Sequence, residues 1–498
     1  MPALPVPLYS AAQTRELDRL ASEQLGVSVD TLMARAGQAA FNLIKAQWPA
    51  ARHLAIFCGP GHNGGDGLVL AKLAAEHGYQ LSVYQLADDK PLAAATAAAQ
   101  AQLIQVGASV LPCPAHLPAC DLIVDALLGT GINRAVEAEF ATVIGLINQA
   151  APIPVLSLDI PSGLHADSGQ ALGTAVMATK TLSFLGLNAG LLTGEGPDFC
   201  GALYFADLDV PETIHQAITP IAQQLQFEQF KPLLTPRKRS AHKGLYGHVW
   251  LVGGDQGMSG AIRMAAEASL RVGAGLVSVA THPSHAAFVN IGRPELMCHG
   301  VETPHHLTSL LWSCKGLALG PGLGQSDWGK ALFQAALQLD MAMVIDADGL
   351  NLLSQSVEQR DNWILTPHPG EAARLLGCRT AEIQQDRFAA VKALQQKYGG
   401  VVVLKGAGTL IYDGHVPVQL SPFGNPGMSS GGMGDVLTGI IAGLLAQQFS
   451  LFHAACFGVV LHALAADQGA QQAGEKGLLA MDLMPALQRL INLREDRA

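Results

Sequence analysis

Residues 424 to 439 read GNPGMSSGGMGDVLTG and continue into an apolar segment that ends near residue 446. Five glycines precede Asp435 in this stretch. Glycines let successive backbone N–H groups converge on an anion, and the start of the following helix adds roughly half a positive charge. The stretch therefore predicts a turn-to-helix phosphate cradle with Asp435 at its edge.

Two roles for Asp435 follow from this position. A carboxylate beside a bound phosphate is electrostatically unfavourable unless it handles a proton or a metal, which favours a catalytic acid or base. Aspartate is also a preferred N-cap residue, so a purely structural role as a helix cap stays open.

Other glycine-rich turns follow apolar runs in the same half of the chain. VVVLKGAGTLI (401–411) places Lys405 after a β-branched run, where it is either a phosphate contact or a strand-end charge reaching solvent. ALGPGLG (318–324) and LVGGDQGMSGA (251–261) repeat the pattern. Several such turns fit an α/β sheet whose strand ends form a nucleotide site.

The N-terminal half has its own turn in HLAIFCGPGHNGGDGLVLAKLAAEHG (53–78), between a short buried strand and a helix. Asn63 and Asp66 occupy the turn. They either form Asx-turns with their own backbone or supply polar groups to a cation or a ligand.

Two later strands of this half also deliver acidic residues to their ends. DLIVDALLGTGINR (121–134) carries Asp125, and VLSLDIPSGL (155–164) carries Asp159 and then Ser162. Acidic residues at successive strand ends are costly in a core and natural in a site. We expect the C-terminal ends of these strands to form a site.

The order of these segments predicts a two-domain α/β protein. Residues 11–49 have the spacing of two amphipathic helices, and strands then alternate with helices to about residue 210. The Gln- and Pro-rich stretch 212–240 runs into the basic cluster PRKRSAHK and reads as a surface connection, although the cluster could instead attract dinucleotide phosphates. The predicted organisation is a first domain over 1–215, a linker over 216–240 and a second domain over 241–498.

Composition narrows the class of protein. A chain of 498 residues with net charge −10 and no long basic run argues against nucleic-acid binding. The eight cysteines form no C-x-x-C pair, which favours buried thiols in a reducing compartment. Neither a secretory signal nor an apolar run long enough to span a bilayer is evident. We predict a soluble cytoplasmic enzyme, a homo-oligomer, with no membrane partner.

The second half resembles the ADP- or ATP-dependent NAD(P)H-hydrate dehydratases, which have a ribokinase-like fold. The resemblance rests on HKGLYGHVWLVGG (242–254), GMSGA (257–261), GPGLG (320–324), DADGLN (346–351), LTPHPGE (365–371), KGAGT (405–409) and NPGMSSGGMGDVLTG (425–439). It implies nucleotide contacts from Lys405, Gly406, Ala407, Gly408, Thr409 and Gly434, and hydrated-dinucleotide contacts from Ala261, Gly322, His368 and Asp435. Met433 and Gly349 depart from the threonine and alanine common in the family.

The first half resembles the NAD(P)H-hydrate epimerases, with a Rossmann-like doubly wound sheet, through its NGGDG, DALLGTG and DIPSG motifs. The likeness implies K⁺ held by Asn63, Asp125 and Ser162 with backbone carbonyls. It implies substrate contacts from His62, Asn63, Gly64, Gly65, Asp66, Gly129, Thr130, Gly131, Ile132, Asn133, Arg134, Ala135 and Asp159, with Asp159 also catalytic. His62 stands where the family has asparagine.

The combined resemblance implies repair of NADHX and NADPHX, the hydrated forms of the reduced nicotinamide cofactors. The first domain would interconvert the R and S epimers, and the second would dehydrate the S epimer with ADP or ATP, using Asp435 as base. Glu371 could order Mg²⁺ through water, or together with His368 simply start a helix. An alternative is a small-molecule kinase fused to a non-catalytic dinucleotide-binding module.

Overall fold

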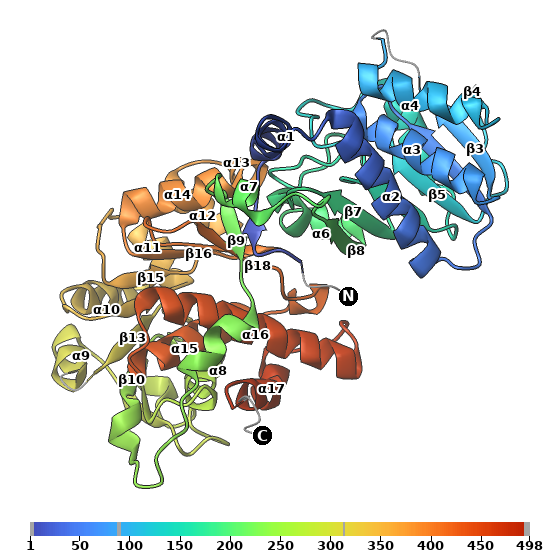
Figure 1. Ribbon diagram of the computed structural model, residues 1–498. Helices are drawn as coiled ribbons and strands as arrows, with labels where there is room; N and C mark the ends of the chain where they lie inside the picture. Colours follow the sequence, from blue (N-terminus) through green and yellow to red (C-terminus); the bar gives the residue numbers. More distant parts are fainter. Residues whose placement is uncertain (1–3, 87–90, 312–313, 493–498) are drawn as a thin grey trace. The chain divides into compact units, whose positions relative to one another are not determined.

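The computed structural model describes residues 4–86, 91–311 and 314–492 (Figure 1). The chain divides into two compact units, Met1–Gln223 and Gln224–Ala498. Each unit has an α/β architecture, and the α/β fold class predicted from the sequence is confirmed.

A parallel sheet forms the centre of the first unit. Its strand order is β4-β3-β2-β5-β6-β7-β8. The bounds are β2 (His53–Cys58), β3 (Gln80–Gln85), β4 (Val110–Pro112), β5 (Leu122–Ala126), β6 (Val155–Leu158), β7 (Lys180–Phe184) and β8 (Ala202–Ala206). Because β2 pairs with β3 on one side and β5 on the other, the strand order reverses between β2 and β5. Ligands of such sheets bind beyond the carboxyl ends of the strands at this reversal.

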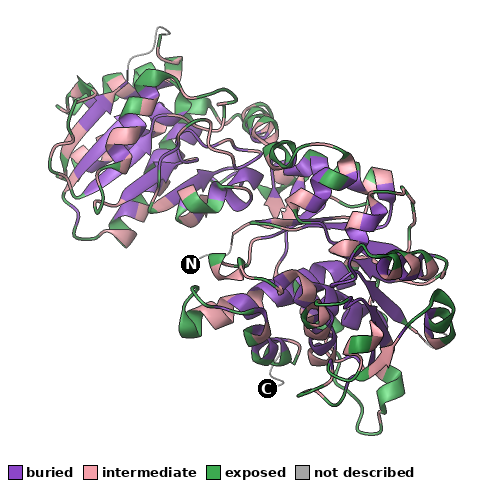
Figure 2. Cartoon of the chain, turned by 180° about the vertical axis from the view of Figure 1, so that it is seen from behind, coloured by how far each residue is buried: buried purple, intermediate pink, exposed green. Residues whose placement is uncertain are grey.

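Helices cover this sheet, and the buried residues gather on its two faces (Figure 2). The two amphipathic helices expected over 11–49 are confirmed as α1 and α2. Ser10 caps α1, and its hydroxyl accepts a hydrogen bond from Gln13 N at 3.2 Å. The bounds are α1 (Ala11–Leu25), α2 (Val29–Gln47), α3 (His62–Glu76), α4 (Ala94–Gln105), α5 (Ala138–Asn148), α6 (Gly196–Cys200) and α7 (Glu212–Gln216), with β1 (Pro7–Leu8) and η1 (Ala189–Leu192).

The sheet of the second unit runs β18-β17-β16-β15-β14-β13-β10-β11-β12. Strands β16 to β12 in this order are parallel, and β17 and β18 continue it antiparallel. The bounds are β10 (His248–Val252), β11 (Leu276–Thr281), β12 (Met297–Gly300), β13 (Gly316–Leu319), β14 (Met343–Ile345), β15 (Trp363–Leu365), β16 (Val401–Leu404), β17 (Thr409–Tyr412) and β18 (Val418–Ser421). Strand β10 lies between β11 and β13, so this sheet also has a reversal point.

Helices α8 and α15 cross closely in this unit, and glycine permits the contact. A side chain at Gly439 of α15 would place its Cβ 1.9 Å from the Ala265 carbonyl oxygen of α8. The helices are α8 (Ser259–Arg271), α9 (Pro304–Leu310), α10 (Asp327–Leu337), α11 (Asp348–Leu353), α12 (Pro369–Leu376), α13 (Thr380–Gln385), α14 (Arg387–Tyr398), α15 (Met433–Ala446), α16 (Leu451–Ala473) and α17 (Met484–Leu490). This tight crossing supports the start of α15, where Asp435 lies.

Helix α16 is the one helix among the described residues that is long and apolar enough to cross a bilayer. Its apolar character has another explanation, because 67% of its most apolar window is buried in the molecule. Ile440 and Ile441 of α15 and Phe457 and Val460 of α16 belong to the same hydrophobic cluster. The helix is therefore part of the core of the second unit.

The stretch predicted as a linker, 216–240, contains β9 (Ala222–Gln224) and the 3-10 helix η2 (Phe227–Leu233). Phe227 and Phe230 are buried in the core of the second unit. The Phe230 ring stacks on Phe457 with a centroid distance of 5.0 Å. Residues that follow β9 thus contribute to the second unit.

Candidate active sites

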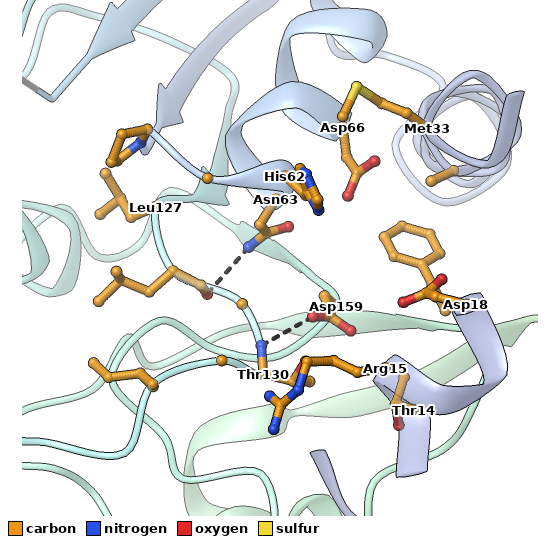
Figure 3. Close-up of a pocket in the computed structure, with 18 of the residues that line it drawn as sticks. Thr14, Arg15, Asp18, Met33, His62, Asn63, Asp66, Leu127, Thr130 and Asp159 are labelled. Carbon is orange, nitrogen blue, oxygen red and sulfur yellow. Dashed lines mark hydrogen bonds between the residues drawn. The ribbon is translucent and has the colours of Figure 1, made fainter. Parts of the chain in front are cut away.

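The first unit contains a cavity of about 880 Å³ at the carboxyl ends of β2, β5 and β6 (Figure 3). Most of the substrate contacts predicted from the sequence line it. They are His62, Asn63, Asp66, Gly129, Thr130, Gly131, Ile132, Asn133, Arg134, Ala135 and Asp159. Segments that are far apart in the sequence meet here because the parallel strands bring their carboxyl ends to one edge of the sheet.

Gly64 and Gly65 are buried in the first turn of α3 rather than in the lining of the cavity. A Cβ at Gly64 would lie 1.9 Å from the Gly59 carbonyl oxygen, and one at Gly65 would lie 2.4 Å from Met33 Cε. Gly64 is thus required for packing of the turn, whereas a side chain at Gly65 would displace the end of the Met33 side chain. Their contact with substrate stays a prediction.

Asp159 lies in the cavity on a strained backbone. Its φ is 66°, a left-handed conformation that is uncommon for residues with a side chain. The carboxylate accepts a hydrogen bond from Thr130 N at 3.1 Å. A Cβ at Gly129 would lie 2.9 Å from Asp159 Oδ2 and would displace the carboxylate from this position. These contacts hold the carboxylate in one position on the cavity wall.

The three predicted K⁺ ligands lie together at the cavity wall. Asn63 and Ser162 both contact the Leu128 carbonyl oxygen, and Ser162 contacts Asp125. Asn63 Nδ2 donates to this oxygen at 3.1 Å, and Ser162 Oγ lies 3.2 Å from it. Ser162 Oγ also donates to Asp125 Oδ1 at 2.5 Å. Burial raises the pKa of Asp125, although hydrogen bonds from Ser162 and Ser157 oppose the shift.

One atom of this cluster lacks a partner. Asn63 Oδ1 is buried and accepts no hydrogen bond, which is costly for an amide oxygen. Amide, hydroxyl and carboxylate oxygens are the ligands that hard cations prefer. The residues present therefore fit a bound K⁺. No cluster of three or more His, Cys, Asp or Glu side chains with metal-binding geometry occurs in the described parts of the chain.

Three carboxyl groups in the cavity have raised pKa values. Burial and the nearby Asp159 raise the pKa of Asp18 to about 7. Burial raises the pKa of Asp159 to about 6 against the hydrogen bonds from Thr130. Burial, Asp159 and Asp18 hold the pKa of Asp66 well above its usual range. Such shifts are typical of sites that transfer protons.

The contribution of α1 to the cavity was not predicted from the sequence. Thr14, Arg15 and Asp18 line it from this helix. A weak signal was available, because Thr14 and Asp18 are four residues apart and so share a helix face. The buried residues Leu17 and Ala21 follow Thr14 and Asp18 by three positions each and so lie beside them on the helix.

The second unit brings together Lys405, Gly434 and Asp435, which the sequence placed in one predicted site. Lys405 Nζ donates to Asp346 Oδ1 at 2.8 Å and lies 3.8 Å from Glu371 Oε2. A Cβ at Gly434 would lie 3.3 Å from Lys405 Nζ. Burial lowers the pKa of Lys405, but Asp346 and Glu371 outweigh it and the net shift is upward.

Asp435 is not the cap of its helix. The N-cap of α15 is Gly432, in a left-handed conformation with φ of 93°, and Asp435 is the third residue of the helix. Burial and the neighbouring Asp346 raise the pKa of Asp435 to about 7, while Lys405 opposes the shift. The structural reading of Asp435 as an N-cap is therefore wrong, and a proton-accepting role is compatible with its pKa.

Asp346 joins the cluster of Lys405 and Asp435, and no role was predicted for it from the sequence. It directly follows β14, and its buried carboxylate also accepts a hydrogen bond from Thr438 Oγ1 at 2.6 Å. The signal was an acidic residue after the apolar strand Met343–Ile345, the same pattern as Asp125 in the first half. Asp346 fixes Lys405 relative to α15.

His368 and Glu371 together start helix α12. His368 Nδ1 accepts from Gly370 N at 3.0 Å, and Glu371 Oε2 accepts from His368 N at 2.8 Å. The helix-start reading is thus confirmed for both residues. Glu371 also faces Lys405, and the His368 ring is exposed. Both side chains can therefore contact a ligand as well as start the helix.

A buried arginine donates hydrogen bonds to the backbone of the predicted nucleotide loop, residues 405–409. Arg387 donates to the carbonyl oxygens of Leu404 and Gly408, each at 3.3 Å, and to that of Lys405 at 3.4 Å. Burial lowers the pKa of Arg387 to about 10. Gly406 and Ala407 are exposed, and Thr409 Oγ1 donates to the Gly406 carbonyl at 2.9 Å.

Ala261 and Gly322 are adjacent at the reversal point of the second sheet. A Cβ at Gly322 would lie 3.2 Å from Ala261 Cβ. Gly324 N, two residues on, donates to Asp348 Oδ2 at 2.9 Å, and Asp348 also raises the pKa of Asp435. Gly322 thus lies on a loop that is hydrogen-bonded to the acidic cluster, and Ala261 contacts this loop from α8.

Comparison with known proteins shows the family of each half of the chain. Residues 29–190 match the family described as YjeF-related protein N-terminus, and residues 249–489 match NAD(P)H-hydrate dehydratase. The chain is 50% identical to the bifunctional NAD(P)H-hydrate repair enzyme of Coxiella burnetii, over 97% of this chain and 99% of that one. It is 43% identical to the enzyme of the same name from Escherichia coli, over 98% and 95%.

A solved ribokinase-like superfamily protein from Enterococcus faecalis is 30% identical, with a TM-score of 0.51, over 54% of this chain and 95% of that one. Fold and sites together define a two-part α/β enzyme, one part with an acid-lined cavity and one with a lysine at a glycine-rich helix start. The chain belongs to the bifunctional NAD(P)H-hydrate repair enzymes. The predicted family, enzyme class and ribokinase-like second half are confirmed.

Proposed function

We propose that the cavity of the first unit is the epimerase site and that the Lys405–Asp435 cluster is the dehydratase site. The proposal is carried by one observation: residues predicted separately from distant motifs line a single cavity in one unit and meet around a single lysine in the other. The substrates are NADHX and NADPHX, with ADP or ATP as co-substrate in the second reaction.

In the epimerase site, Asp159 handles the proton of the hydroxyl group on the hydrated ring carbon. Its fixed position and its pKa of about 6 suit this role. K⁺ would be held by Asn63, Asp125 and Ser162, where it would offset the buried charge of Asp125 and supply a partner for Asn63 Oδ1.

In the dehydratase site, the terminal phosphoryl group of the nucleotide is transferred to the substrate hydroxyl. Asp435 accepts the hydroxyl proton, and Lys405 stabilises the phosphate charge. Phosphate is a better leaving group than hydroxide, and the ring nitrogen lone pair expels it. Glu371 would order Mg²⁺ through water, and His368 would contact the dinucleotide.

The kinase alternative uses the same geometry and differs in its product. Purified protein is incubated with S-NADHX, Mg²⁺ and ADP or ATP, and absorbance of the restored dihydronicotinamide is followed. We expect reduced cofactor to appear in step with inorganic phosphate, and AMP to form from ADP, which we propose is preferred. A stable phosphorylated product without restored cofactor contradicts the dehydratase assignment.

We further propose a soluble cytoplasmic enzyme that assembles as a homo-oligomer. The support for a soluble cytoplasmic enzyme is compositional: net charge −10 and free thiols at every cysteine among the described residues. Sedimentation of the purified chain tests the assembly, and a single monomeric species contradicts it.

A further inference from the structure

Asp18 is a carboxyl group of the first cavity that no sequence motif assigns; the other, Glu137, pairs with Arg134. It projects from α1, and Figure 3 shows the carboxyl groups of Asp18, Asp66 and Asp159 pointing into one space from three elements. The cavity is also marked as a ligand site by Asn63, whose buried Oδ1 has no partner. Asp18 is therefore placed to touch whatever the cavity binds.

The chemistry of epimerisation requires proton transfer on two faces of the substrate ring. On one face, a carboxylic acid protonates the hydroxyl group, the C–O bond breaks, and water leaves as the ring nitrogen lone pair forms a C=N⁺ bond. On the other face, a water oxygen bonds to the carbon, the π electrons return to nitrogen, and a carboxylate takes the extra proton. Atoms and charge balance, and the configuration is inverted.

Asp159 alone cannot serve both faces, because Thr130 N holds it on one wall of the cavity at 3.1 Å. We infer that the Asp18 carboxyl group is the second proton-transferring group of the epimerase, acting on the ring face opposite to the one that Asp159 serves. This inference rests on the proposed assignment of the cavity as the epimerase site. In each turnover one of the two groups gives a proton and the other accepts one.

Asp66 fits this role less well than Asp18. Burial, Asp159 and Asp18 raise the pKa of Asp66 well above its usual range, which disfavours the ionised form that accepts a proton. Asp18 has a pKa of about 7, so both of its protonation states are populated near neutral pH. The titratable or charged side chains that line the cavity with Asp18 are Arg15, His62, Asp66, Arg134, Glu137 and Asp159.

The test uses the full chain with Asp18→Asn, and with Asp18→Ser as a second variant. Asp159→Asn is the reference for the site. Glu23→Gln is the matched control, because it removes one carboxylate from the same helix at an exposed position paired with Arg19. We expect Asp18→Asn to lower the epimerase kcat by roughly a hundred-fold or more with KM nearly unchanged. Glu23→Gln should behave as wild type, with equal melting temperatures.

Water labelled with a heavy oxygen isotope gives a second readout. In the Asp18 variants Asp159 can still remove and return water on its own face, so label should enter one epimer without inversion. Wild type should incorporate label at each inversion. A structural role for Asp18 would not produce this separation of exchange from inversion.

Two outcomes overturn the inference. Wild-type inversion in Asp18→Asn with inactive Asp159→Asn means that Asp18 transfers no proton. A rise in KM alone means that Asp18 binds substrate without moving a proton. If Asp18→Asn and Asp159→Asn both epimerise the substrate at the wild-type rate, the cavity is not the epimerase site. The proposed function of the cavity then fails as well.

Discussion

At the scale of single residues, Asp435 gives the sharpest test of the dehydratase site. Because Gly432 is the cap of α15, Asp435→Asn removes a proton acceptor without removing a cap. We expect the dehydratase kcat to fall by roughly a hundred-fold or more, with nucleotide binding and melting temperature nearly intact. Turnover and thermal unfolding of the variant check this, and wild-type turnover would remove Asp435 from the mechanism.

The pH dependence of dehydration follows from the same residue. A general base must be ionised, and the pKa of Asp435 is about 7, so kcat/KM should rise from pH 6 to pH 8 and level off above it. The free energy of unfolding changes with pH in the opposite direction. Because the pKa of Asp435 is higher in the folded protein than in the unfolded chain, its contribution to stability is fully present below about pH 4 and is lost as the pH rises through 7. Asp435→Asn should abolish the pH-dependent rise in residual activity.

The K⁺ site is tested better through Asn63 than through Asp125. Asp125 accepts hydrogen bonds from Ser157, Ser162 and Leu127, so Asp125→Asn would turn an amide N–H₂ toward donors and destabilise the domain. Asn63→Ala removes the unpaired oxygen. We expect epimerisation in this variant to lose its stimulation by K⁺ over Na⁺, and stimulation equal to wild type would rule Asn63 out as a ligand.

At the scale of elements, α16 holds the start of the glycine-rich stretch that precedes α15. Asp467 of α16 accepts hydrogen bonds from Gly424 N at 3.0 Å and from Asn425 Nδ2 at 2.8 Å. Asn425 Oδ1 in turn accepts from Gly427 N at 3.0 Å. We expect Asp467→Asn, which can accept only one of these donors well, to raise KM for the nucleotide about tenfold and to change kcat less.

The reciprocal exchange is the control for this element. In Asn425→Asp combined with Asp467→Asn, the carboxylate and the amide change places and can pair again, so nucleotide KM should recover relative to either single variant. Gln472→Ala, an exposed change on the same helix, should have no effect. A double variant no better than Asp467→Asn contradicts the positioning role.

The elements themselves were largely predictable, and the meeting of side chains was less so. Strands β5 and β16 were predicted from apolar runs next to glycine, because a buried parallel strand is recognised from the local composition of the sequence. Asp18 and Asp346 were missed because their roles depend on which strand and helix ends the sheet order brings together. The sequence left open whether Asp435 caps α15, because the left-handed conformation in which Gly432 enters the helix is visible only in the structure.

At the scale of the whole molecule, the two activities should be separable. The contact boundary lies between Gln223 and Gln224, and each side has its own sheet and core. We predict that a fragment of residues 1–223 equilibrates the epimers, and that a fragment of residues 224–498 dehydrates only the S epimer. Mixing the fragments should let R-NADHX be repaired at a rate set by the first fragment, above the spontaneous background.

The position of the cut matters because Phe227 and Phe230 pack in the second core, with Phe230 stacked on Phe457. Loss of a buried phenylalanine costs about 3–5 kcal/mol, so a fragment that begins at residue 234 should unfold at a clearly lower temperature than one that begins at 224. Asp159→Asn in the full chain should stop epimerisation and leave dehydration of the S epimer unchanged. If that variant stays folded but loses dehydration, the two sites do not act independently.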